Sequence, residues 1–330
     1  MKIIINKKHL NPPLQLATSV LDAKPALETL TGILIEAKND TVTITASDSN
    51  LSTKLFIRGR AVIEEEGVVL LEGKTFAGAI SKLDGDITIE KLRANIRITN
   101  GVAEYKLRSI DVNLYPQIDF TISENEFSIN GNEFNHALSK VINSTSNTDE
   151  RPIFSGVNFL SKDNRLEFIA TDSYRLSKTH VQLQEETQVS AVVLSDTLKT
   201  VMKIAKDQNL HISTSSNKVT FRTDNALFIT RIIDGVYPDV ERLIPVTFNT
   251  QVFVDRARLK EAVDRSSFVK ENNIWALNLD FSHGILKLVT EADDVGSTYE
   301  EVDIRLEGSE VKLTLNGQFL TNALNALADE

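Results

Sequence analysis

Two groups of polar residues have the side-chain types that chemistry would need. The run Asp172–Arg175 could form a small polar catalytic site, and Glu291, Asp293 and Asp294 could hold a metal ion. Their spacing fits no nucleophile elbow, phosphate loop or EF-hand. Acidic runs of this kind more often lie in solvated loops, so catalysis is the less favoured hypothesis.

The remaining ligand-type residues give little support to a metal or redox centre. The chain has five histidines, and none has another histidine three or four positions away. It has no cysteine, which excludes disulfides, iron–sulfur clusters, thiolate zinc sites and cysteine nucleophiles. We therefore expect no metal and no cofactor.

Charge and composition restrict the function further. The 36 Lys and Arg residues are outnumbered by 46 Asp and Glu, giving a net charge of −10, which argues against coating nucleic acid through bulk charge. Any contact with DNA must be local or topological.

The 330 residues, 41% of them apolar, predict two or three ordered domains. No apolar run approaches the roughly 20 residues of a membrane span, and no secretory signal opens the chain, so we expect a cytoplasmic protein.

The chain contains an internal repeat. The segment Thr31–Ile57 aligns without a gap on Ser155–Val181, so that Asp48 falls on Asp172. A third, weaker copy covers Trp275–Ile304. Repetition on this scale indicates one structural unit used three times.

Each copy has the same predicted order of elements. Alternating runs predict strands, and apolar residues at helical spacing predict two helices per unit. Ser195 and Asn316 stand at two of the predicted helix starts. The order is β-α-β-β-β-α-β-β-β, an α+β class in which helices cover the buried face of an antiparallel sheet.

Hairpins and turn pairs predict where the units end. Asn100-Gly101 and Asp224-Asn225 each join two alternating runs. Each hairpin is followed by a Tyr-Pro pair, after which the pattern restarts. Few residues follow the last helix, so we expect the third unit to be incomplete. The predicted domains are 1–122, 123–246 and 247–330.

Three features of the chain together resemble the β sliding clamp of bacterial DNA polymerase III. They are the segment ATDSYRLS of the middle repeat, the segment RIIDGVYPDVERLIP that closes this repeat, and the antiparallel unit that occurs three times. The resemblance covers the whole chain. It implies a DNA-clamp fold in which two head-to-tail subunits form a ring around duplex DNA, with sheets outside and helices inside. It implies a non-catalytic processivity subunit that keeps a polymerase near its template.

The resemblance and the predicted helices together assign a set of DNA-facing cations. These are Lys24, Lys74, Lys82, Lys140, Arg151, Lys199, Lys203, Lys206, Arg258 and Arg265. Lys199, Lys203 and Lys206 are spaced to share one helix face. Many family members have a basic pair where this chain has Ser195-Asp196, so contact with DNA is expected to be weaker there.

The resemblance also implies an apolar cleft that takes short linear peptides of partner proteins. The expected partners are the catalytic subunit of DNA polymerase III, the clamp loader, and repair and translesion polymerases. The matching residues are Phe154, Thr171, Ser173, Tyr174, Arg175, Leu176, Pro238, Arg242, Leu243, Asn316 and Phe319. Asp172 is interpreted as structural. Because the final strands and tail that complete the cleft in the family are missing from the sequence, we expect weakened peptide binding.

Ring closure in the family joins an edge strand of the first domain to one of the third. The matching residues are Tyr105, Leu107, Phe268, Glu301, Val302 and Ile304. The alternative to a homodimeric ring is a monomeric clamp-like protein, or a clamp fragment, that binds partners without encircling DNA.

Overall fold

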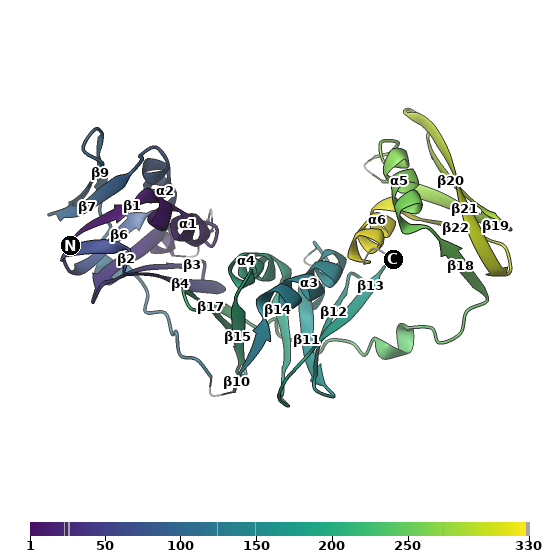
Figure 1. Cartoon of the computed structure of the whole chain (residues 1–330), viewed down its shortest axis with the longest axis horizontal. Coiled ribbons are helices and arrows are strands. Elements are labelled where there is room, and N and C mark those ends of the chain that lie inside the picture. Colours follow the sequence, from purple (N-terminus) through teal and green to yellow (C-terminus); the bar gives the residue numbers. More distant parts are fainter. Residues whose placement is uncertain (23, 26, 124, 149, 273, 328–330) are drawn as a thin grey trace. The chain divides into compact units, whose positions relative to one another are not determined.

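The computed structural model describes residues 1–327 except 23, 26, 124, 149 and 273. Its helices and strands recur three times along the chain (Figure 1). The first repeat consists of β1 (Lys2–Asn6), α1 (Lys7–Thr18), β2 (Gly32–Lys38), β3 (Thr41–Ser47), β4 (Leu51–Arg58), β5 (Ala61–Glu65), β6 (Gly67–Glu72), α2 (Gly73–Ser81), β7 (Asp86–Leu92), β8 (Asn95–Thr99) and β9 (Glu104–Arg108).

The second and third repeats follow the same plan. The second consists of β10 (Glu126–Asn130), α3 (Gly131–Val141), β11 (Gly156–Lys162), β12 (Arg165–Thr171), β13 (Leu176–Gln182), β14 (Ser190–Leu194), α4 (Ser195–Ala205), β15 (Asn209–Thr214), β16 (Lys218–Arg222) and β17 (Ala226–Arg231). The third consists of β18 (Thr250–Val254), α5 (Arg256–Ser266), β19 (Ala276–Ser282), β20 (Ile285–Ala292), β21 (Gly296–Gly308), β22 (Val311–Asn316) and α6 (Gly317–Ala326).

The α+β class and the antiparallel repeats are confirmed, but the predicted order was one strand short between the helices. In the part of the chain that the structure describes, four strands separate the helices in the second and third repeats, and β5 adds a fifth in the first. The short strand β5 is formed by its pairing with β1, where Ile63 lies opposite Ile3. A long-range pairing of this kind leaves no local signal in the sequence.

The passage from strand to helix is set by side-chain caps. The Asn6 side chain accepts a hydrogen bond from the Lys8 backbone N–H at 3.2 Å where β1 passes into α1. Asn316 caps α6 in the same way, as predicted. Ser195 does not cap α4: it is the first helical residue, and Leu194 occupies the cap position without a side-chain hydrogen bond.

The strands of the described residues form four antiparallel sheets. Their orders are β5-β1-β7-β8-β9, β10-β15-β16-β17-β4-β3-β2-β6, β13-β12-β11-β14 and β18-β21-β20-β19-β22. The eight-stranded sheet continues from one repeat into the next because β17 pairs with β4, with Phe228 opposite Thr53 (Figure 1). The strand β9 ends its sheet with β8 as its one partner among the described residues.

The chain divides into two compact units. One comprises residues 1–137, 148–168 and 180–234, and the other comprises 138–147, 169–179 and 235–330. The first unit has an aromatic core in which the Phe134 ring of α3 lies 6.2 Å from Phe159 and 5.8 Å from Phe168. The second has a core in which Trp275 and Leu324 pack among buried aliphatic side chains of β19, β20 and β21. No helix in the described part of the chain is long and apolar enough to span a membrane.

Candidate functional site

A tight turn between β12 and β13 organises the predicted partner site. The Asp172 carboxylate accepts hydrogen bonds from the backbone N–H groups of Tyr174 and Arg175, both at 3.0 Å. The Thr171 hydroxyl donates to the Arg175 carbonyl at 2.7 Å. Ser173 has a φ of 77°, a left-handed conformation that these bonds hold in place.

The turn fixes the direction of Arg175. Its Nε donates to the second Asp172 oxygen at 3.0 Å, and its side chain is mostly buried. The guanidinium lies 4.3 Å from the centroid of the Phe319 ring, which belongs to α6. A guanidinium at this distance is attracted to an aromatic ring. Two predicted pocket residues from distant parts of the sequence are therefore in contact within the second unit.

Other predicted pocket residues of this unit expose apolar surface. Tyr174 is 86% exposed and Leu243 is 72% exposed, while Leu176 is half-buried and Pro238 is exposed. These side chains belong to two segments, 174–176 and 238–243. Exposed apolar patches are typical of protein-binding surfaces. Arg242, which is exposed, lies 3.6 Å from Asp239 and keeps its guanidinium at the surface.

Phe154 was predicted to form one wall of the same cleft. The structure places it in the first compact unit, where it is buried and its ring lies 5.8 Å from the Arg151 guanidinium. The remaining cleft residues belong to the second unit. The assignment of Phe154 to the cleft therefore stays a prediction.

The turn has an equivalent in the first repeat. Asp48 accepts hydrogen bonds from the backbone N–H groups of Asn50 and Leu51 at 2.8 and 2.6 Å, and Ser49 also has a positive φ. Asp172 thus has the structural role expected of it. It has a second role that the sequence did not predict, because it also orients Arg175.

The predicted DNA-facing cations fall into two groups by their ion pairs. One group is exposed and has no ion pair among the described residues: Lys24, Lys74, Lys82, Lys203 and Lys206. Arg151 is exposed beside Phe154, and Lys140 is half-buried on α3. Lys199 pairs with Asp196 at 2.8 Å, Arg258 with Asp303 at 3.5 Å and Arg265 with Glu300 at 2.8 Å.

Two of these cations differ in their surroundings from what the sequence predicted. Lys206 is the C-cap of α4 with an extended backbone, so it does not continue the helical face of Lys199 and Lys203. The Arg265 guanidinium donates to both oxygens of Glu300 and holds the pKa of that carboxyl below its usual value. No sequence motif predicts that Glu300 pairs with Arg265. The pairing of β20 with β21 brings Glu300 beside α5.

The residues predicted to close a ring lie on strand edges and in the core. Tyr105 and Leu107 are half-buried on the edge strand β9, Phe268 is 73% exposed, and Glu301 is exposed on β21. Val302 and Ile304 are buried in the core of their own repeat. These two residues could therefore take part in an edge contact only through their backbone groups.

Comparisons with known proteins agree along the whole chain. The models of the N-terminal, central and C-terminal domains of the DNA polymerase III β subunit match residues 1–119, 128–239 and 241–330. Proteins named β sliding clamp from Staphylococcus epidermidis and Staphylococcus aureus are each 29% identical, and the alignments cover 100% of this chain and 91% of those proteins. The crystal structure of the DNA polymerase sliding clamp from Bacillus subtilis has a TM-score of 0.93 and 27% identity over 99% of this chain and 90% of that one.

The three matching domain models, the full-length relatives and the shared fold lead to one conclusion. The chain belongs to the bacterial β sliding clamp family, and its function is that of a DNA sliding clamp, a processivity factor of DNA replication.

Proposed function

We propose that this chain encircles duplex DNA as a head-to-tail dimer that closes by pairing β9 of one copy with β21 of the other. The observation that carries the proposal is the junction between the first two repeats. There the last strand of the second repeat, β17, pairs with the fourth strand of the first repeat, β4, and continues its sheet. The corresponding strands β9 and β21 have free edges in the described chain, β21 along its first half.

The internal repeat gives the register of the proposed contact. In the two terminal hairpins Ile98 lies opposite Tyr105 and Phe221 opposite Phe228, so Tyr105 corresponds to Phe228. When the strand pair β20–β21 is compared with the strand pair β3–β4 in the same way, Thr298 on β21 corresponds to Thr53 on β4. Because Phe228 lies opposite Thr53, we expect Tyr105 to lie opposite Thr298 of the second copy.

Burial supports this correspondence. Phe228 and Thr53 are fully buried at the paired junction, whereas Tyr105 and Thr298 are half-buried at free edges. Pairing the two edges would remove apolar surface of Tyr105 and Leu107 from water and satisfy a row of backbone N–H and C=O groups. The exposed Phe268 offers additional apolar surface in the third repeat.

Cysteine cross-linking tests both the contact and its register, because the chain has no cysteine of its own. Hydrogen bonds from Phe56 N–H to Asn225 C=O and from Arg231 N–H to Asn50 C=O make Phe228 and Thr53 a non-hydrogen-bonded pair. Such pairs have Cα atoms about 4.5 Å apart, within disulfide range. Oxidation of the double variant Tyr105→Cys/Thr298→Cys should yield covalent dimers.

The matched control is Tyr105→Cys/Glu300→Cys, which moves one thiol two residues along the same face of β21. It should form little disulfide. Equal cross-linking of both variants, or of the control alone, would contradict the register. A solution mass of 36.7 kDa at every concentration, rather than about twice that value, would leave the monomeric clamp-like protein as the better description.

Within this ring the chain acts without chemistry of its own. The net charge of −10 suits a ring that must slide, since tight contacts to many phosphates would hold it in place. The cations without an ion pair, such as Lys74 and Lys203, would supply weak local attraction to the duplex. Lys199, Arg258 and Arg265 would contribute less, because neighbouring carboxylates offset their charges.

We also propose that the turn Thr171–Leu176, together with Leu243 and Phe319, receives a linear peptide of the replicative polymerase, the clamp loader or a repair polymerase. The exposed Tyr174 and Leu243 offer apolar contacts for Leu or Phe anchors, and Arg175 is held in one direction by Asp172. A preoriented guanidinium loses less entropy when it donates to a peptide carbonyl.

A further inference from the structure

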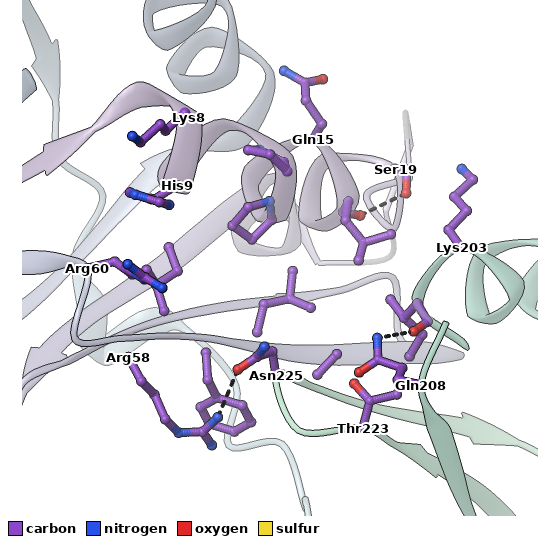
Figure 2. A pocket seen from close by; sticks show the side chains of 18 residues that line it. Lys8, His9, Gln15, Ser19, Arg58, Arg60, Lys203, Gln208, Thr223 and Asn225 are labelled. Carbon is purple, nitrogen blue, oxygen red and sulfur yellow. Dashed lines mark hydrogen bonds between the residues drawn. The ribbon is translucent and has the colours of Figure 1, made fainter. Parts of the chain in front are cut away.

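A groove of about 830 Å³ in the first compact unit is not used by the proposed ring contact or the peptide site. Its floor is the paired strands β4 and β17, and its walls are α1 and the end of α4 (Figure 2). This volume is in the usual range for sites that bind small molecules or single groups of a larger ligand.

The charge of the groove is opposite to that of the whole chain. Its lining includes Lys8, His9, Arg58, Arg60 and Lys203 and has no Asp or Glu. Figure 2 shows Lys8, His9, Arg58 and Arg60 toward one end and Lys203 toward the other. In a chain with ten more acidic than basic residues, a groove of 18 residues without a carboxylate concentrates positive potential.

No acidic side chain within ion-pair distance offsets the charge of three of these cations among the described residues. Lys8, Arg60 and Lys203 have no acidic partner within ion-pair distance among the described residues, and all three are exposed. Arg58 donates to the Asp224 carbonyl and, at 3.2 Å, to the Asn225 side-chain oxygen. These neutral acceptors orient the guanidinium without neutralising it.

The inside of the groove is apolar. Pro12, Pro13 and Leu16 line it from α1, and Leu55, Ile57 and Ile204 line it from the floor and the opposite wall. A ligand that uses the whole groove must therefore combine an anionic group with a flat or apolar one.

Three features favour a nucleotide over a peptide or a duplex. The floor strands already pair with each other, so an incoming peptide backbone finds no free strand edge there. The Gln208 side-chain amide is engaged with the Ile204 carbonyl, which removes one of the groove's own peptide-binding donors. A duplex keeps the flat faces of its bases stacked inside, so these faces cannot reach the apolar surface of the groove.

We infer that this groove binds an unpaired nucleotide of single-stranded DNA, with a phosphate beside Lys8, Arg58 and Arg60 and the base on the apolar surface of Pro12, Pro13 and Leu16. Phosphate contacts from lysine and arginine combined with base stacking on aromatic side chains form the general basis of single-strand binding. Here the apolar side chains of Pro12, Pro13 and Leu16 would take the place of the aromatic rings. The inference does not depend on ring closure, because a short linear oligonucleotide can reach the groove of a free monomer.

Fluorescence anisotropy with a labelled oligothymidylate of about eight nucleotides at low salt tests the inference. The variant Lys8→Glu/Arg60→Glu should raise Kd at least about tenfold and reduce its salt dependence, because two phosphate contacts are lost. The control Lys162→Glu/Arg165→Glu changes the net charge equally at exposed positions of another hairpin and should bind nearly as the unaltered chain does.

A second variant separates base contact from charge. Leu16→Ser should weaken binding of the single strand about three- to fivefold through lost base contact and leave any weak binding of a hairpin duplex unchanged. Equal loss in both charge-reversal variants would overturn the inference, as would equal sensitivity of duplex and single strand to Leu16→Ser. Displacement of the oligonucleotide by an acidic apolar peptide that binds more tightly would assign the groove to a peptide instead.

Discussion

At the scale of single residues, Asp172 both builds a turn and orients Arg175. Asp172→Ala removes both roles, whereas Asp48→Ala removes the same kind of turn in the first repeat. We expect Asp172→Ala to weaken binding of a peptide with Leu and Phe anchors about tenfold, as loss of a preoriented charged donor does. Fluorescence anisotropy with a labelled peptide measures this.

Asp48→Ala is the matched control, since it should leave peptide affinity unchanged although it removes two similar backbone hydrogen bonds. A loss of similar size in both variants would show that general destabilisation, rather than Arg175, accounts for the effect. Arg175→Lys should also bind weakly, because an ammonium lacks the planar fork that stacks on Phe319.

A second prediction concerns acid stability. Arg222 donates to both oxygens of Glu126, at 3.0 and 2.5 Å, and holds the pKa of Glu126 below the usual 4.5. Because the folded pKa is lowered, the pair stabilises the fold fully above about pH 4.5 and loses this contribution as the pH falls through the lowered value.

Glu126→Gln should cost about 0.5–1 kcal/mol at neutral pH and flatten the acid limb of the stability curve. Urea unfolding across a pH series measures both effects, with the exposed Glu186→Gln as control. An acid limb in Glu126→Gln as steep as that of the unaltered chain would show that other carboxylates control acid unfolding.

At the scale of elements, glycine positions test how closely the helices approach. A Cβ at Gly131, the first residue of α3, would lie 1.7 Å from the Ala205 carbonyl oxygen and 2.5 Å from that of Gln208. The backbone would have to move, so Gly131→Ala should cost at least about 2 kcal/mol.

Gly78→Ala is the opposite case within α2. A Cβ there meets no atom within 4 Å, and alanine restricts the unfolded chain, so stability should rise by about 0.5–1 kcal/mol. Thermal unfolding of both variants measures the two signs. If Gly131→Ala were as stable as the unaltered chain, the described contact between α3 and the end of α4 would be wrong.

The elements also show how far the sequence could predict this molecule. Periodicity predicted the helices and most strands of each repeat and the closing hairpins of the first two, and Asn316 identified a helix start, because these signals are local. Ser195 misled because serine favours caps in general, while the chain enters α4 one residue earlier. The strand β5 and the contact of Arg175 with Phe319 depend on segments distant in sequence, which no local pattern encodes.

At the scale of the whole molecule, the repeat explains both the sheet junction inside the chain and the contact proposed between copies. The pairing of β17 with β4 continues a sheet from the first repeat to the second. Within the described residues, β9 and the first half of β21 have free edges at the equivalent places. A ring made this way needs no sequence recognition of DNA, since it holds the duplex by topology. Its retention should therefore depend on the form of the DNA and hardly on salt.

Retention on circular DNA tests this claim most directly. The variant Tyr105→Cys/Thr298→Cys is mixed with nicked circular DNA, oxidised, and separated from free protein in high salt. We predict that the cross-linked dimer stays with the circle and is released when a restriction enzyme linearises it. A cross-linked dimer that leaves the intact circle in high salt, or remains equally on linear DNA, would contradict encirclement.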